Sequence, residues 1–106
     1  DPVEPGLAPV PAIRQVLARA GIAPSDLARA EVMEAYAVQA MACVTGAGVN
    51  PEIVNIGGGG LARGHPIGAS GAILAVRLFH GVRGGLGLAA IAAAGGLGTA
   101  VVVARP

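Results

Sequence analysis

The 106-residue sequence predicts one α/β domain, in which helices and buried strands follow one another along the chain. Two observations lead to this prediction. Several segments carry apolar residues at helical spacing and are separated by short, glycine-bounded apolar runs. The last two runs, GLAAIAAAG and GTAVVVA, lack the alternation of a strand with one wet face, so both of their faces are expected to be covered.

The first half of the chain predicts two helices separated by a turn and an extended segment. In AIRQVLARAG, the residues Ile13, Val16 and Leu17 share one helical face, and Gly21 ends the helix. The segment IAPSDLARA turns and then extends. The alanine-rich segment EAYAVQAMACV, residues 34–44, consists largely of helix formers and predicts the second helix.

The second half predicts a strand, a glycine-rich loop, a helix and two more strands. EIVNI, residues 52–56, predicts a short strand. Residues 67–82 predict a helix with apolar residues around most of its circumference, which is expected to be buried on several sides. Residues 84–104 carry no charge and are long enough for a membrane helix, but glycines interrupt them. A β-branched run follows those glycines, which favours two buried strands joined by a glycine turn.

The charge pattern excludes several classes of function. The net charge is +1, which argues for neither a nucleic-acid partner nor an anionic membrane. All six acidic residues lie at or before Glu52, which disfavours paired-carboxylate hydrolysis and most metal sites. Cys43 is the only cysteine, so a reducing, cytoplasmic location is expected and no disulfide framework exists. Its alanine-rich surroundings favour a buried, inert thiol.

The segment GGGGLARGHPIGASG, residues 57–71, surrounds one histidine with glycines. It is no phosphate-binding loop, because the chain has no lysine for a P-loop and no acidic residue downstream to bind a ribose. Pro66 keeps His65 out of the helical conformation, and imidazoles in general, with an unperturbed pKa of ~6.5, exchange protons at neutral pH. A functional base and a structural loop histidine both fit His65, whereas a packing or helix-capping role fits His80.

The segment NPEIVNIGGGGLARGHPIGASGA resembles the G-H-P loop of thiolases, the enzymes that cleave or condense acyl-CoA thioesters. Upstream, the segment ending in EVMEAYAVQA resembles the approach to the thiolase N-E-A-F motif, and GLAAIAAAGGLG resembles the segment holding the C-x-G motif. The resemblance covers residues 1–106, apart from a shorter turn after His80. It implies the C-terminal half of the thiolase fold: an α/β domain with a mixed sheet and helices on both faces, its first strand missing. The helix at 67–82 would then lie between two sheets.

The resemblance also implies roles for individual residues. His65 matches the histidine that activates a nucleophilic cysteine and helps to form an oxyanion hole. Met33 stands where the motif asparagine is expected, and Ala92 where the second cysteine is expected, so both are degenerate catalytic positions. The backbone N–H groups of Ala94 and Gly95 are candidates for a second oxyanion hole.

Three functions follow as hypotheses. The first is the C-terminal part of an acyl-CoA acyltransferase, weakened at Met33 and Ala92, that works only with the missing N-terminal half, in a homo- or hetero-oligomer. Its substrate would be a coenzyme A thioester, with no metal and no permanently bound cofactor. The second is a non-catalytic thiolase-like subunit that binds acyl-CoA or scaffolds a partner chain. The third is a structural module in which the glycine loop serves packing alone.

Overall fold

A three-stranded mixed sheet forms the centre of the computed structural model, which describes residues 1–106. Its strands lie in the order β1 (Leu27–Val32), β2 (Gly85–Ala93) and β3 (Leu97–Arg105). β1 runs parallel to β2, with Ala30 beside Leu88, and β2 pairs antiparallel with β3 through a glycine turn. The prediction of two strands joined by a glycine turn at 84–104 is therefore confirmed, but the expectation that both are buried is wrong for β3, which forms an edge of the sheet and contains no buried residue. No helix of the chain combines the length and apolarity needed to cross a bilayer.

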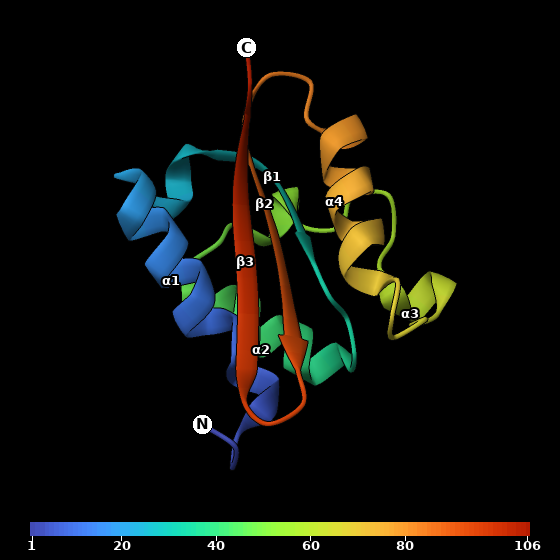
Figure 1. The fold of residues 1–106 in the computed structure, drawn as a ribbon. Helices are drawn as coiled ribbons and strands as arrows, with labels where there is room; N and C mark the ends of the chain where they lie inside the picture. The colour runs from blue at the N-terminus through green and yellow to red at the C-terminus, as the bar shows by residue number, and fades with distance from the viewer.

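Helices cover both faces of the sheet, as predicted (Figure 1). The helices of the chain are α1 (Pro9–Ala20), α2 (Ala37–Ala47), α3 (Gly60–Arg63) and α4 (Ser70–Gly81), with 3₁₀ turns at Pro5–Leu7 (η1), Pro24–Asp26 (η2) and Pro51–Ile53 (η3). The helices α1 and α2 share one face, and α4 lies on the other.

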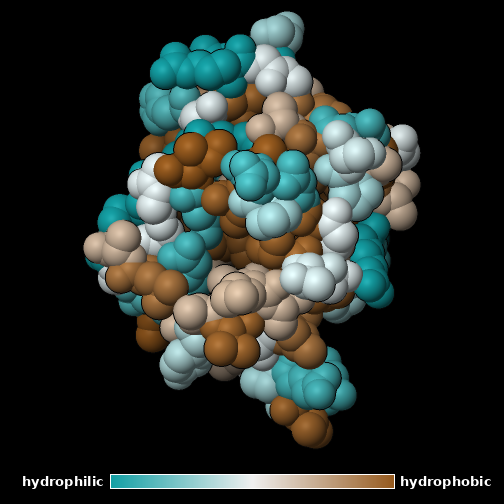
Figure 2. Space-filling model, turned by 180° about the vertical axis from the view of Figure 1, so that it is seen from behind, coloured by the Kyte–Doolittle hydropathy of each residue, from teal (hydrophilic) through white to brown (hydrophobic).

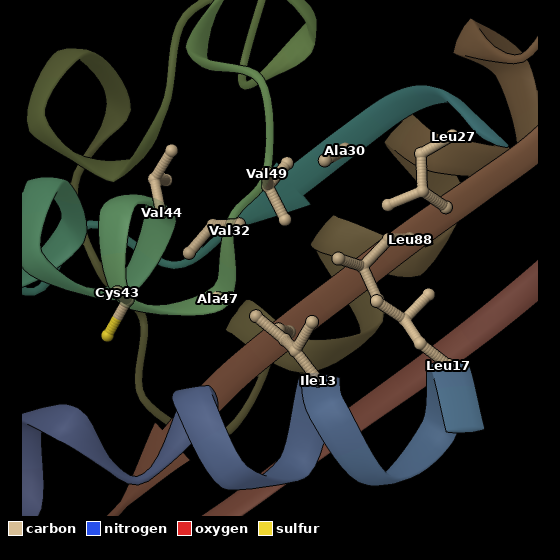
Figure 3. Packing of buried hydrophobic residues seen from close by; sticks show 11 residues of the cluster. Ile13, Leu17, Leu27, Ala30, Val32, Cys43, Val44, Ala47, Val49 and Leu88 are labelled. Atoms are coloured by element: carbon tan, nitrogen blue, oxygen red, sulfur yellow. The ribbon is translucent and has the colours of Figure 1, made fainter. Parts of the chain in front are cut away.

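The main core lies between the sheet and the α1–α2 layer. Ile13 and Leu17 of α1 point toward Leu88 of β2, while Cys43 of α2 closes the far end of the cluster (Figure 3). Prolines in its first turn suit the start of α1, and Gly21 ends the helix in the left-handed conformation at φ 68°. This core fixes the sheet. Residues 33–36 and 94–96 follow the carboxyl ends of β1 and β2, whereas the glycine-rich segment lies between η3 and α4.

The second face carries a smaller cluster and leaves much of α4 uncovered. Leu74 and Leu78 are buried against the sheet, but Val76 is 56% exposed and Phe79 is 66% exposed. The prediction that this helix is buried on several sides is wrong for the chain by itself, because its sheet covers only one face of α4. Hydrophobic residues also lie exposed across the middle of the hollowed face seen in Figure 2.

Local turn chemistry changed three predicted boundaries. The strand expected at 52–56 is wrong: Pro51 begins η3, the Asn50 side chain accepts a hydrogen bond from the Glu52 amide, and only Val54 bridges to Ala30 of β1. The helix expected at 34–44 begins at residue 37 because Tyr36 has an extended backbone, and it continues to residue 47. The helix expected at 67–82 spans residues 70–81.

Candidate functional site

His65 follows α3 and precedes α4, with its side chain exposed. Gly64 has φ +91°, a conformation that side chains rarely adopt, so glycine is required at the turn that presents the imidazole. The Nδ1 atom of His65 lies 2.6 Å from the Oγ of Ser70, which is buried in the first turn of α4. That hydroxyl donates its single proton to the carbonyl oxygen of Pro66 at 3.0 Å. The network thus assigns the imidazole proton to Nδ1 and leaves the Nε2 lone pair free.

A cleft of about 560 Å³ brings His65 together with the end of β2. Ala92 and Ala94 line its far side, and Tyr36 and Gln39 contribute from the start of α2. Three of the predicted site residues, from segments far apart in the chain, therefore share one cleft. Gly95, the fourth, lies outside the lining, in the exposed turn after β2 at φ +82°.

Met33 lies outside the cleft as well. It is 4% exposed and packs with Leu74 and Leu78 in the smaller cluster beneath α4. It borders a separate hollow of about 110 Å³, together with Ser70 and Gly64. A thioether is at most a weak acceptor, so this position supplies no hydrogen-bond donor toward the cleft.

The cleft contains an imidazole but no thiol. Cys43, the only thiol, is fully buried; its Sγ donates to the carbonyl of Gly6 at 3.2 Å and accepts from Gln39 Nε2 at 3.3 Å. Burial raises the pKa of the Cys43 thiol, an effect that the Gln39 hydrogen bond only partly offsets. His80 is exposed in the last turn of α4, with its ring edge-on to Phe79. No group of three His, Cys, Asp or Glu side chains is arranged to hold a metal.

Sequence reasoning missed Ser70. The available signal was its position, five residues after the histidine in the first turn of the predicted helix, where a hydroxyl reaches back over the preceding loop. A larger hollow, about 740 Å³, lies elsewhere, between α2 and the segment around η3. It contains neither histidine nor an exposed thiol, and both oxygens of its one carboxylate, Glu34, already accept hydrogen bonds. This hollow therefore offers no imidazole, no thiol and no carboxylate with a free oxygen.

The chain is similar to known proteins over its whole length. The family described as "Thiolase, C-terminal domain" matches residues 1–105. The cytosolic acetyl-CoA acetyltransferase of Mus musculus is 44% identical, over 99% of this chain and 27% of the mouse protein. The acetyl-CoA acetyltransferase of Rhizobium meliloti is 45% identical, over 99% of this chain and 28% of that protein. The chain thus spans less than a third of the length of these curated relatives.

Solved structures agree with this placement. The Acat5 thiolase of Ascaris suum, crystallised with coenzyme A, superposes with a TM-score of 0.95 at 36% identity, covering 100% of this chain and 28% of that one. The peroxisomal 3-ketoacyl-CoA thiolase of Saccharomyces cerevisiae gives 0.94 at 30% identity, covering 99% of this chain and 30% of that one. The latter is described as a five-layered structure built from two core domains of identical topology.

Proposed function

The chain belongs to the thiolase family, in which it is the C-terminal domain, and on this premise we propose that it supplies one half of an acyl-CoA acyltransferase site. The reaction class is acyl transfer from a coenzyme A thioester, in the direction of Claisen condensation or of thiolysis. The single observation that carries the proposal is the shared cleft of His65, Ala92 and Ala94. An imidazole with a free Nε2 at the edge of such a cleft is suited to activate a thiol brought to it.

The other half of the site is proposed to lie on an N-terminal thiolase half, in the same gene product or on a partner chain. Two observations support the need for a second half of the site. The cleft contains no thiol, because Cys43 is buried elsewhere. The outer face of α4, with Val76 and Phe79, presents apolar surface that this chain leaves uncovered. A second domain packed on α4 would bury that face and bring its own nucleophile to His65. A homo- or hetero-oligomer is proposed for the complete assembly, and the yeast relative is described as dimeric.

The substrate is proposed to be a coenzyme A thioester, without a permanently bound cofactor or a metal. Support comes from the Ascaris relative, which was crystallised with coenzyme A. The names of the relatives place them in the cytosol, in mitochondria and in peroxisomes, so the family does not fix the compartment. The cytoplasmic location proposed for this chain rests on its single, buried thiol.

Turnover is proposed to be weak, since two side chains lack the groups that the motifs imply. Met33 is buried and has no donor to orient a water at an oxyanion, and losing one such donor typically costs about 10²–10³ in rate. Ala92 lines the cleft but transfers no proton, which typically costs another ~10²–10⁴. The backbone N–H groups of Ala94 and Gly95 stay candidates for stabilising the second oxyanion, because alanine and glycine both keep that donor.

Acyl transfer in the complete assembly tests the proposal. Transfer of an acyl group from acyl-CoA to the nucleophile should be measured for the natural protein and for His65→Ala. The expected result is a loss of about 10²–10⁴-fold in the variant, because the base is gone. His80→Ala serves as the matched control, since His80 is exposed on α4 and does not line the cleft. Equal rates for the natural protein and His65→Ala would remove the imidazole from the reaction.

The second candidate function is a subunit that binds acyl-CoA without turnover. It is favoured by Ala92, which lines the cleft and transfers no proton. The double substitution Met33→Asn and Ala92→Cys separates the two candidates. A large gain in thiolysis from an inactive starting protein supports the non-catalytic subunit. High thiolysis before any substitution excludes it.

A further inference from the structure

Two side chains outside the cleft fasten the glycine segment to the end of β1. Asn55 is the only non-glycine residue with a positive φ, 48°, and its carboxamide pairs with both backbone groups of Val32. The Oδ1 atom accepts from the Val32 amide at 2.9 Å, and Nδ2 donates to the Val32 carbonyl at 2.8 Å. The Asn55 side chain thus takes the place of a neighbouring strand at the edge of β1, just after the bridge formed by Val54.

Glu34 extends this anchor into the loop that carries the histidine. Its Oε1 accepts a hydrogen bond from Asn55 Nδ2 at 2.8 Å, the second bond that this nitrogen donates. Its Oε2 accepts a hydrogen bond from the backbone N–H of Leu61 at 3.0 Å. Leu61 belongs to α3, which ends two residues before His65. Both carboxylate oxygens are therefore occupied by donors, one from the β1 edge and one from the glycine segment.

Two glycines of the loop leave the space that this carboxylate and its neighbour Met33 occupy. A Cβ at Gly59, which is buried, would overlap the carboxylate of Glu34. A Cβ at Gly60 would overlap the methyl group of Met33 and come within 3.1 Å of the Glu34 carbonyl oxygen. The backbone therefore passes so close to Glu34 that no side chain fits at these two positions, which accounts for two of the four consecutive glycines.

We infer that Glu34 is a positioning residue for His65, acting through the Leu61 amide rather than on any substrate. It sets where α3 sits relative to β1, and so where the imidazole stands relative to Ala92 and Ala94 at the end of β2. This role rests on the proposed function and deepens it. In a site that works by orientation, a displacement of about 1 Å costs up to roughly 100-fold in rate.

Glu34→Gln tests the inference in the complete assembly. The glutamine keeps the size of the side chain but has one acceptor oxygen. Either Asn55 Nδ2 therefore keeps only the Val32 carbonyl as an acceptor, or the Leu61 amide loses its side-chain acceptor. The measurements are acyl-transfer kinetics and the ¹⁵N resonances of the His65 ring. The expected result is a roughly 10- to 100-fold lower kcat, a nearly unchanged KM, and altered His65 resonances. Glu52→Gln is the matched control; it removes an exposed carboxylate that makes no side-chain hydrogen bond and should change neither quantity.

A lower unfolding temperature for Glu34→Gln with unchanged His65 resonances would overturn the inference, because the carboxylate would then be purely structural. Where that variant does not fold, Asn55→Gly replaces it, since glycine keeps the positive φ and removes the donor to Glu34. Unchanged His65 resonances in Asn55→Gly overturn the inference as well. The His65 resonances can be measured without turnover. If the natural protein shows no acyl transfer, the proposed function is refuted, but the His65 resonances of the variants still decide the positioning role.

Discussion

The Nδ1 atom of His65 and the Oγ of Ser70 lie 2.6 Å apart, with the hydroxyl itself donating to the carbonyl oxygen of Pro66. A serine hydroxyl has one proton, so at this contact Ser70 accepts and the imidazole donates. The neutral ring is thereby held in the tautomer that leaves Nε2 free, which is the atom a nucleophile would need to reach. Because Ser70 lies in the first turn of α4, the helix that packs on the sheet also orients the His65 ring.

We expect Ser70→Ala to remove the contact that orients the His65 ring. Without the hydroxyl, the ring loses its Nδ1 partner, both neutral tautomers become populated, and acyl transfer is expected to fall about tenfold or more. Ring ¹⁵N shifts of His65 measure the tautomer ratio, and single-turnover acylation measures the rate. Ser25→Ala, at an exposed serine of η2, is the control. An unaltered tautomer ratio together with an unaltered rate would show that the contact plays no part in orienting the ring.

A buried carboxylate joins α4 to β1. Glu31 is fully buried; its Oε1 pairs with Arg29 Nη2 at 2.8 Å and its Oε2 with Arg77 Nε at 3.4 Å. Arg77 also donates from Nη2 to the carbonyl of Gly58 at 3.2 Å, so the ion pair reaches the glycine segment. The side chains of both arginines are mostly buried, at 17% and 26% exposure, so neither recovers full hydration when its partner is lost.

Glu31→Gln should therefore lower the free energy of unfolding by about 3 kcal/mol, because it leaves two mostly buried guanidinium groups without a counter-charge. Urea denaturation checks this prediction, with the midpoint falling and the slope unchanged. Glu52→Gln removes the same charge from an exposed position and should change the free energy by less than about 0.5 kcal/mol. Similar midpoints for the two variants would contradict a stabilising role for the buried pair.

Much of the architecture could be predicted from local pattern alone. The helix ending at Gly21, the terminal pair of strands and the helix after the G-H-P loop all show in the sequence, since each rests on periodicity or on a glycine stop. The grouping of His65, Ala92 and Ala94 needed the family resemblance, because the sheet brings together residues distant in sequence.

The remaining features depend on contacts that local pattern does not contain. The 3₁₀ turn at Pro51 replaced a strand because the Asn50 cap and the proline outweighed the apolar run that follows. The exposure of α4 reflects the extent of this chain's own sheet, not any property of the helix. The Glu34–Asn55 pair joins residues 21 positions apart, and Met33 is buried by a helix that starts 37 residues later. Such pairings become visible only when the fold is known.

The close approach of the glycine segment to Glu34 predicts that Gly59→Ala is destabilising. The new Cβ would overlap the Glu34 carboxylate, although the backbone itself has an ordinary φ of −110°, so the cost comes from packing and not from strain. A loss of about 1–3 kcal/mol in the free energy of unfolding is expected. Gly68→Ala is the matched control, since a Cβ there meets no atom within 4 Å. Equal stability of the two alanine variants would show that the loop does not pack on the carboxylate as described.

Cys43 predicts how stability depends on pH in the alkaline range. Burial raises the pKa of its thiol above the ordinary value of 9.0, so the folded state holds the proton more tightly than the unfolded state. As pH rises above 9.0, the unfolded chain ionises first, and the free energy of unfolding falls until the folded thiol also ionises. Urea denaturation across this range should show the decline in the natural protein and a smaller decline in Cys43→Ala.

Because Cys43 is buried, a thiol-specific disulfide reagent at neutral pH should label it only as the protein unfolds, and rapid labelling of the native state would contradict its burial.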